Sequence, residues 1–289
     1  MTSVVSIANK ELWEDRESLE DYILSPEELP PTDLIYDDGE PMETNHHRIA
    51  MNILIDSVEN FLMKQQDDFY VGGNMFIYYS ATQARNRDFR GPDFFLVLDT
   101  NSDVLRKAWV VWNENGRYPD VVIELMSPST AHADKHEKKD IYEKIFKTRE
   151  YYVFDPFDRT SLQGWRLNNK MKYEEITPNE KGWLFCESVN LWLGTWEGVI
   201  RRENNHWLRF FDRNSNLVLL PSEEEQQKAQ LAQEEAQLAQ QEAQQAQQKA
   251  QLAQEEAQHA QQEAQLAKEK YERLAARLRE LGENPQDYS

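Results

Sequence analysis

The sequence lacks several features that would place it in a common protein class. It has one cysteine among 289 residues, Cys186, which excludes an internal disulfide. No stretch approaches the roughly 20 apolar residues that cross a bilayer. Residues 1–21 contain neither the basic region nor the apolar run of a secretion signal. We therefore expect a soluble, cytoplasmic protein that does not associate with membranes.

Positive charge is also in short supply. The chain has 32 Lys and Arg residues against 52 Asp and Glu residues, a net charge of -20. Residues 1–222 alone hold 25 basic and 38 acidic residues, which leaves them at -13. Nonspecific nucleic-acid binding depends on lysine and arginine neutralising phosphates. The composition therefore argues against avid binding of that kind unless a basic patch or a bound metal compensates.

Aromatic residues are almost absent from the C-terminal part of the chain. All 8 Trp precede Glu223, and residues 223–281 are almost entirely Ala, Gln, Glu and Leu. A packed core can be built only from the first part of the chain. The predicted division is an irregular N-terminal segment (1–35), a globular domain (36–222), a helical segment (223–281) and a short tail (282–289).

The helical segment repeats every seven residues. One continuous register places these residues at the a and d positions: Ala229, Ala232, Ala236, Ala239 and, further on, Tyr271, Leu274, Leu278 and Leu281. Heptads that continue without Gly or Pro favour a coiled coil. We therefore expect a homodimer through residues 223–281. A single solvated helix is the alternative, because an alanine seam buries little surface while alanine alone favours helix.

The globular part mixes helical and strand patterns, which predicts an α/β (α+β) fold with a mixed sheet and flanking helices. Apolar residues at helical spacing predict a helix over 45–62, with Asn45 as its N-cap. Short β-branched and aromatic runs predict strands within 69–80, 93–98, 107–112, 120–126 and 150–156. The charged segment 132–148, with Ile141, Ile145 and Phe146 on one side, is helical by period and joins the last two strands in a crossover. Further segments between 161 and 220 are expected to extend the same sheet as hairpins.

Two carboxylates stand at the ends of predicted strands. Asp93 begins the run DFFLVL, and Glu124 interrupts the apolar run VVIELM. A buried ionised carboxylate is costly unless it is partnered, so Glu124 is the stronger candidate. Proline–aspartate at a strand start is also ordinary turn chemistry. Both carboxylates, with a carbonyl and phosphate oxygens, would suffice for Mg²⁺. His47 fits a hydrogen bond to such a ligand, or a helix cap.

A lysine on the predicted helix could complete a catalytic site. Lys138 lies four residues after Asp134 and four before Tyr142, so the three share one helix face. A lysine there would orient the attacking water and offset phosphate charge. Lys135 and Lys139 compete for this role, and a solvated charged face fits the pattern as well.

Five segments together resemble a bacterial family, the Uma-two family of putative restriction endonucleases, long catalogued only as a domain of unknown function. They cover roughly residues 36–160 and read DGEPMETNHHRI, GPDFFLVL, YPDVVIELMSPST, DKHEKKDIYEK and EYYVFDP. The resemblance implies a PD-(D/E)XK restriction-endonuclease-like core and an endodeoxyribonuclease that cleaves DNA with Mg²⁺, with Mn²⁺ as a substitute.

The same resemblance implies roles for individual residues. Asp93 and Glu124 would be the metal ligands, Lys138 the catalytic lysine, and Asp134 and His47 accessory residues. The standard motif carries its lysine two residues after the glutamate, where this chain has Met126. Activity therefore depends on the helix lysine taking that place.

A catalytically inactive protein that uses the nuclease fold to bind a partner is the competing hypothesis. It draws on the acidic globular part, on Met126 and on a tail without catalytic residues. Magnesium binding and DNA affinity at low salt distinguish the two.

Overall fold

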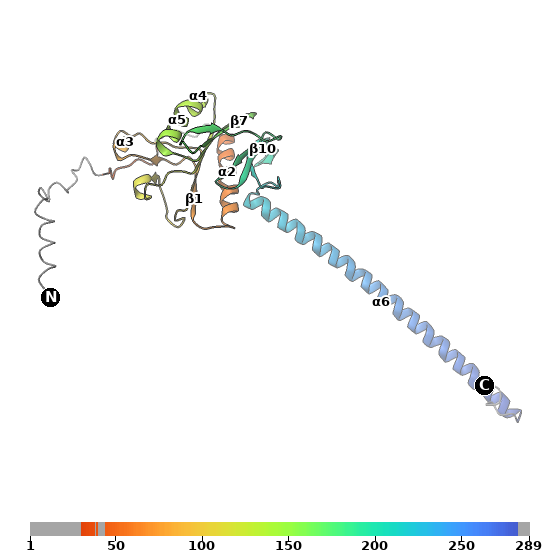
Figure 1. Cartoon of the computed structure of the whole chain (residues 1–289). Coiled ribbons are helices and arrows are strands. Elements are labelled where there is room, and N and C mark those ends of the chain that lie inside the picture. Colours follow the sequence, from red (N-terminus) through yellow and green to blue (C-terminus); the bar gives the residue numbers. More distant parts are fainter. Residues whose placement is uncertain (1–29, 38, 40–43, 283–289) are drawn as a thin grey trace, which may run out of the picture. The chain divides into compact units, whose positions relative to one another are not determined.

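The computed structural model describes residues 30–37, 39 and 44–282 (Figure 1). Residues 1–29, 38, 40–43 and 283–289 lie outside the described residues; they include most of the predicted irregular start, part of the predicted globular domain and almost all of the predicted tail. The chain divides into two compact units, Met1–Ser222 and Glu223–Ser289.

The first unit is built on a six-stranded mixed sheet. Its strands lie in the order β1 (Phe69–Gly72), β3 (Phe94–Leu98), β5 (Val121–Leu125), β6 (Glu150–Asp155), β7 (Asp158–Leu167) and β8 (Tyr173–Glu175). β5 and β6 run parallel, and the other neighbouring pairs are antiparallel. Parallel neighbours need a crossover connection, and the helical segment 131–146 provides it, as the sequence predicted.

Two smaller sheets accompany the first. β2 (Ile77–Tyr78) and β4 (Trp109–Val110) form a parallel pair. β9 (Leu184–Cys186), β10 (Leu191–Ile200) and β11 (Glu203–Phe211) form an antiparallel sheet of three strands. The expectation that every later strand extends the first sheet is therefore wrong. β7 and β8 extend it, whereas β9–β11 bury their own apolar face against the first helix, and residues 216–220 contribute one bridge, between Phe211 and Leu217.

The first described helix, α2 (Asn45–Leu62), has the predicted range but a different cap. The hydroxyl of Thr44 accepts the backbone N–H of His47 at 3.0 Å. Asn45 is already the first helical residue, and its side chain donates instead to Glu203 at 2.7 Å. The predicted N-cap was thus one residue late, because Thr44 satisfies the free N–H groups at the helix start equally well.

The crossover between β5 and β6 is a helical segment made of four short consecutive pieces. They are α4 (Ala131–Ala133), η3 (Asp134–Lys138), α5 (Lys139–Ile141) and η4 (Tyr142–Phe146), of which η3 and η4 are π-helical. The remaining short helices are α3 (Ala81–Arg85) and the 3-10 turn η2 (Val111–Asn113). π-Helical turns are rare and frequently mark functional sites. Of the three apolar residues predicted to face inward, Phe146 is buried but Ile145 is 46% exposed.

The sheet separates two apolar layers, because successive side chains of a strand point to opposite faces. On one face, Val121, Ile123 and Leu125 of β5 pack with α2 and with β9–β11. On the other face, Val122 and Met126 pack with the crossover and with β2 and β4. Glu124 shares this second face. The predicted mixed α+β fold, with a central mixed sheet, flanking helices and a long C-terminal helix, is confirmed.

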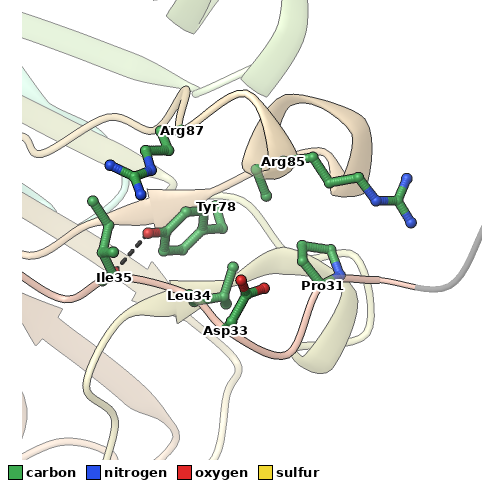
Figure 2. Close-up of a pocket in the computed structure, with 8 residues that line it drawn as sticks. Pro31, Asp33, Leu34, Ile35, Tyr78, Arg85 and Arg87 are labelled. Carbon is green, nitrogen blue, oxygen red and sulfur yellow. Dashed lines mark hydrogen bonds between the residues drawn. The ribbon is translucent and has the colours of Figure 1, made fainter. Parts of the chain in front are cut away.

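A short N-terminal segment, residues 30–37, packs beside β2. The hydroxyl of Tyr78 donates to the carbonyl of Ile35 at 2.6 Å, and Leu34 and Ile35 pack against a third apolar cluster around Phe76 and Tyr78. A pocket of about 160 Å³ lies here (Figure 2). It is lined by Pro31, Asp33, Leu34, Ile35, Tyr78, Ala84, Arg85 and Arg87.

Helix α6 (Pro221–Glu280) is 60 residues long. Its first two residues, Pro221 and Ser222, are counted with the first unit, and the rest of the helix makes up the described part of the second unit. Proline suits the first helical position because the N–H it lacks would have no helical partner there. Leu231, Leu238, Leu252 and Leu266 are 54–60% exposed. Dimerisation through this helix stays a prediction. Among the described residues, no helix is long and apolar enough to cross a membrane.

Candidate active site

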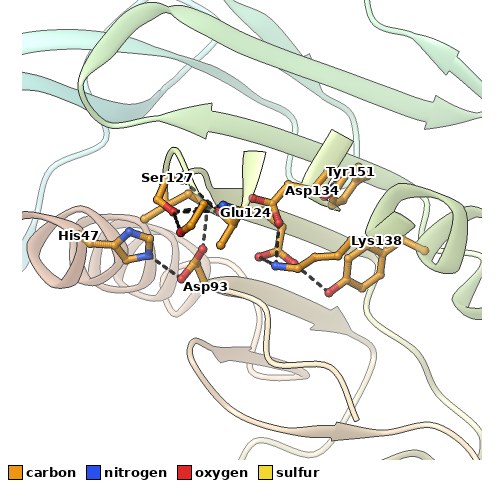
Figure 3. Close-up of polar contacts among 11 residues, drawn as sticks. His47, Asp93, Glu124, Ser127, Asp134, Lys138 and Tyr151 are labelled. Atoms are coloured by element: carbon orange, nitrogen blue, oxygen red, sulfur yellow. Dashed lines mark hydrogen bonds and ion pairs between the residues drawn. The ribbon is translucent and has the colours of Figure 1, made fainter. Parts of the chain in front are cut away.

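The two candidate carboxylates lie on neighbouring strands. Phe94 of β3 pairs with Ile123 of β5, which brings the preceding Asp93 alongside Glu124. Figure 3 shows both carboxylates between His47 on one side and Lys138 on the other. The fold therefore gathers residues that are 14 to 91 positions apart in the sequence.

Asp93 is held by two hydrogen bonds, one to each carboxylate oxygen. Nε2 of His47 lies 2.7 Å from Oδ1. The backbone N–H of Leu125 donates to Oδ2 at 2.7 Å. The second bond ties Asp93 to the residue that directly follows Glu124, so both carboxylates keep a fixed relative position.

The start of α2 is fixed to β11, which in turn fixes His47. Nδ1 of His46 lies 2.9 Å from Oε2 of Glu203, and the side-chain amide of Asn45 donates to Oε1 of the same carboxylate. The His46 ring packs on Trp207, with ring centroids 4.4 Å apart. His46 thus has a structural role, while the next residue turns toward Asp93.

Glu124 is buried, with 1% of its surface exposed. Its Oε2 accepts from Nζ of Lys138 and its Oε1 from the hydroxyl of Tyr142, each at 3.0 Å. Burial raises the pKa of Glu124 to about 7, and the like charges of Asp93 and Asp134 add to this, against the opposing effect of Lys138. Burial and the nearby Glu124 also raise the pKa of Tyr142, so its hydroxyl remains a donor.

Lys138 bridges two carboxylates. Besides Glu124, its Nζ lies 2.7 Å from Oδ1 of Asp134, one π-helical turn before it. Burial by itself would lower the pKa of Lys138, but the attraction of Glu124 and Asp134 outweighs it and raises that pKa above its usual value. Lys138 is therefore firmly cationic and can donate hydrogen bonds or offset negative charge.

Neither competing lysine contacts Glu124 among the described residues. Lys139 places its Nζ 4.3 Å from the ring centre of Trp165, on another side of the helix. Asp134, by contrast, is fixed beneath Lys138, because the hydroxyl of Tyr151 donates to its carbonyl at 2.7 Å. The structure thus brings Lys138, and neither Lys135 nor Lys139, to the strand carboxylates.

Position 126, which holds Met rather than Lys, faces the crossover. Met126 points to the same face of β5 as Glu124, where it is 3% exposed in the apolar layer under the crossover. The crossover lies over this face. A side chain that descends from the helix therefore reaches the same carboxylate that a lysine at position 126 would approach along the strand.

Three parts of this arrangement escaped the sequence-based selection of site residues. They are the Tyr142 hydroxyl, the Leu125 backbone N–H and the Tyr151 hydroxyl. Tyr142 carried a usable signal, because it lies four residues after Lys138. The other two bonds depend on strand register and on the path of the crossover, which the sequence does not specify.

The charges of the site fit a divalent cation. Lys138 contacts Glu124 and Asp134, and the charge of the neighbouring Asp93 also acts on Glu124. The described residues contain no group of three or more His, Cys, Asp or Glu that could hold a metal. Mg²⁺ keeps several waters and is commonly bound by one or two carboxylates. The strand pair thus suits Mg²⁺ better than a metal that needs a full protein cage.

Comparisons with known proteins point to one family. The family model Uma2, described as "Putative restriction endonuclease", matches residues 19–194. One similar solved structure is that of a protein from Anabaena variabilis, described as a putative nuclease belonging to DUF820. It is 15% identical, with a TM-score of 0.37, over 53% of this chain and 81% of that chain. No curated protein matches the sequence.

Proposed function

The chain belongs to the Uma2 family of restriction-endonuclease-like proteins, and from this premise we propose that it is a magnesium-dependent endonuclease that hydrolyses phosphodiester bonds of DNA. The observation that carries the proposal is the convergence of two strand carboxylates and one helix lysine on a single point of the fold. The family match supports nuclease chemistry. The metal, the substrate and the residue roles are proposals.

Asp93 and Glu124 would hold the metal. Both offer hard carboxylate oxygens, which Mg²⁺ and Mn²⁺ prefer. A bound Mg²⁺ would supply Lewis-acid stabilisation of the phosphate charge and lower the pKa of a bound water. His47 and the Leu125 backbone N–H keep Asp93 oriented, as residues behind metal ligands often do.

Lys138 would act on the substrate as a cation rather than as a base. Its pKa is raised, so it keeps its proton at neutral pH. A protonated lysine can donate to a phosphate oxygen and offset the charge that develops during in-line attack of water. Asp134 would hold its Nζ in place when Glu124 turns to other partners.

The test is DNA cleavage by the purified full-length protein with magnesium or manganese. Glu124→Gln and Lys138→Met are expected to lower the rate by about 100-fold or more, the scale seen when one preorganised charge-stabilising group is removed. Lys144→Met is the matched control, because this lysine lies on the same crossover, is half exposed and pairs with Asp140. Cleavage that persists in both site variants would show that the site is assigned wrongly.

An inactive interaction protein is the second candidate function. The observation in its favour is that Lys138 already satisfies Glu124 and Asp134 as an internal ion-pair cluster. Met126 and the acidic charge of residues 1–222 agree with it. Calorimetric titration with magnesium separates the two functions, since absence of binding at millimolar metal, with no DNA affinity at low salt, favours the inactive protein.

Helix α6 would pair two copies of the chain. Alanines occupy the a and d positions of successive heptads. A dimer would place two nuclease sites on one DNA duplex. Analytical ultracentrifugation of the full chain and of a chain without residues 223–281 tests this, and the proposal is wrong if both sediment as monomers.

A further inference from the structure

A pocket of about 400 Å³ opens directly beside Glu124 and Lys138. One wall is the site itself and the crossover, including Ala133, Glu137, Ile141 and Tyr142. The facing wall consists of Asn74, Phe76, Phe89, Arg90 and Gly91, from the segments that precede Asp93. This volume falls within the range of pockets that bind small organic ligands.

The wall that faces the site is firmly built. Phe76 and Phe89 stack with ring centroids 3.8 Å apart. The backbones of Ile77 and Arg90 exchange two hydrogen bonds, and the backbone N–H of Asn74 donates to the carbonyl of Pro92 at 2.9 Å. These contacts fix the distance between this wall and Asp93, so the pocket is a preformed part of the site.

The same wall carries positive charge in an acidic protein. This charge is Arg90, which lines the pocket, whereas Arg85 and Arg87 line the separate pocket near Tyr78. Nη1 of Arg90 donates to Asp88 at 2.5 Å and to the carbonyl of Phe89 at 2.6 Å. The hydrogen bonds that Arg90 makes to described residues use Nη1, which leaves Nε and Nη2 to meet an anion.

The pocket thus joins groups for two different parts of a nucleotide. Arg90 and Lys138 offer a guanidinium and an ammonium, which suit phosphate oxygens. Phe89 and Ile141 offer apolar surface, on which a nucleobase can stack or pack. Glu137 adds a negative charge to the crossover wall, which directs a phosphate away from it and toward Arg90 and Lys138.

We propose that this pocket is a subsite for one unpaired nucleotide next to the scissile phosphate, with Arg90 as the residue that positions its backbone phosphate. The inference rests on the proposed nuclease function and adds to it a substrate preference. A base inside the pocket cannot also be paired and stacked in a duplex. Single-stranded DNA, or a frayed or flipped nucleotide in a duplex, is therefore the preferred ligand.

The experiment measures binding without cleavage. Fluorescence anisotropy follows a short labelled single strand, and the same strand in a duplex, with full-length protein in the presence of EDTA. Arg90→Gln is expected to weaken single-strand binding about tenfold, the effect of losing one charge-assisted hydrogen bond. Arg87→Gln is the matched control, since Arg87 lines the separate pocket near Tyr78, and it is expected to bind within about twofold of wild type.

A second variant keeps the test decisive even if Arg90→Gln fails to fold. Asn74 has a positive φ of 47°, a conformation that asparagine and aspartate both tolerate. Asn74→Asp thus keeps the shape of the pocket and adds a negative charge, and it is expected to weaken single-strand binding while the melting temperature stays unchanged. Wild-type affinity in both Arg90→Gln and Asn74→Asp, or equal affinity of wild type for single strand and duplex, would overturn the subsite.

The outcomes also separate this inference from the proposed nuclease function. Single-strand binding that depends on Arg90, without cleavage in magnesium, supports the subsite and refutes the nuclease. Cleavage that depends on Glu124 and Lys138, with binding indifferent to Arg90, supports the nuclease and refutes the subsite. A protein that binds no DNA at low salt refutes both.

Discussion

The hydroxyl of Tyr142 donates to Oε1 of Glu124 at 3.0 Å, between two side chains that are both buried. Glu124 therefore has one neutral and one cationic donor, Tyr142 and Lys138, and both come from the π-helical pieces of the crossover. Among the described residues, the crossover supplies both hydrogen-bond donors to this carboxylate.

Replacement of Tyr142 by Phe removes the neutral donor and keeps the ring. A buried acceptor that loses its donor costs about 1–3 kcal/mol, so the free energy of unfolding is expected to fall by that amount. Urea denaturation measures it. Tyr36→Phe is the control, because this tyrosine is half exposed and its contact with Lys107 is made by the ring, which Phe keeps, so it is expected to change nothing. Equal unfolding free energies for Tyr142→Phe and wild type would contradict the structural role of this bond.

His47 is expected to matter for metal use rather than for folding. Its ring holds Oδ1 of Asp93 at 2.7 Å. Loss of a residue that orients a metal ligand commonly costs about 10–100-fold in metal affinity or activity. His47→Ala should therefore raise the magnesium concentration needed for half-maximal cleavage. The exposed His132 serves as the control, and an equal magnesium dependence in His47→Ala and His132→Ala would show that His47 does not orient a ligand.

The carboxylate of Glu150 predicts how stability depends on pH. Burial would raise its pKa, but the backbone N–H groups of Ser188 and Glu187 and the charge of Arg166 outweigh burial, so the pKa lies below its usual 4.5. A lowered pKa in the folded state means that the stabilisation is complete above pH 4.5 and is lost as the pH falls through the lower, folded-state pKa.

Glu150→Gln tests this linkage. The amide cannot accept all the bonds of the carboxylate, so the free energy of unfolding at neutral pH should fall by about 1–3 kcal/mol. The variant should also lose less stability than wild type between pH 4.5 and more acidic solution. Urea denaturation across this range provides the measurement, and parallel pH profiles would show that Glu150 is not the group responsible.

Gly73 allows a close approach that no other residue can make. A Cβ at this position would lie 2.5 Å from the backbone oxygen of Asp93 and 2.6 Å from Cδ1 of Ile55. Backbone atoms cannot yield as a flexible side chain can, so Gly73→Ala is expected to cost about 1–3 kcal/mol of stability. Thermal unfolding measures this. Gly91→Ala, whose Cβ would meet Phe76 at an ordinary 3.5 Å, is the control and should not destabilise.

Local patterns in the sequence predicted the parts of the fold that depend on period. The range of α2, the strands around Asp93 and Glu124, and the parallel pair β5 and β6 were all predictable, because apolar spacing distinguishes helix from strand. The separate sheet β9–β11 was not predictable in the same way. Its strands have the same alternation as those of β7 and β8, and only the burial of a whole sheet against α2 distinguishes the two.

The candidate site was predictable to a similar extent. Residue chemistry and family resemblance selected Asp93, Glu124 and Lys138, and the structure brings them together. Residue chemistry alone left three lysines open, since a charged helical segment presents lysines on several sides, and it was the family resemblance that selected Lys138. The pocket beside the site combines residues from positions 74–91 with others from 124–142, and no local pattern links these segments.

The hydrogen bond from the Leu125 backbone N–H to Asp93 also bears on how such a site can change over generations. Every residue except proline supplies a backbone N–H, so drift in the side chain at position 125 leaves this tie between the strands intact. The side chains around the carboxylates are then free to be exchanged one at a time. Met126 fills the strand position on this face and Lys138 reaches Glu124 from the crossover, and the backbone tie between the two strands depends on neither side chain.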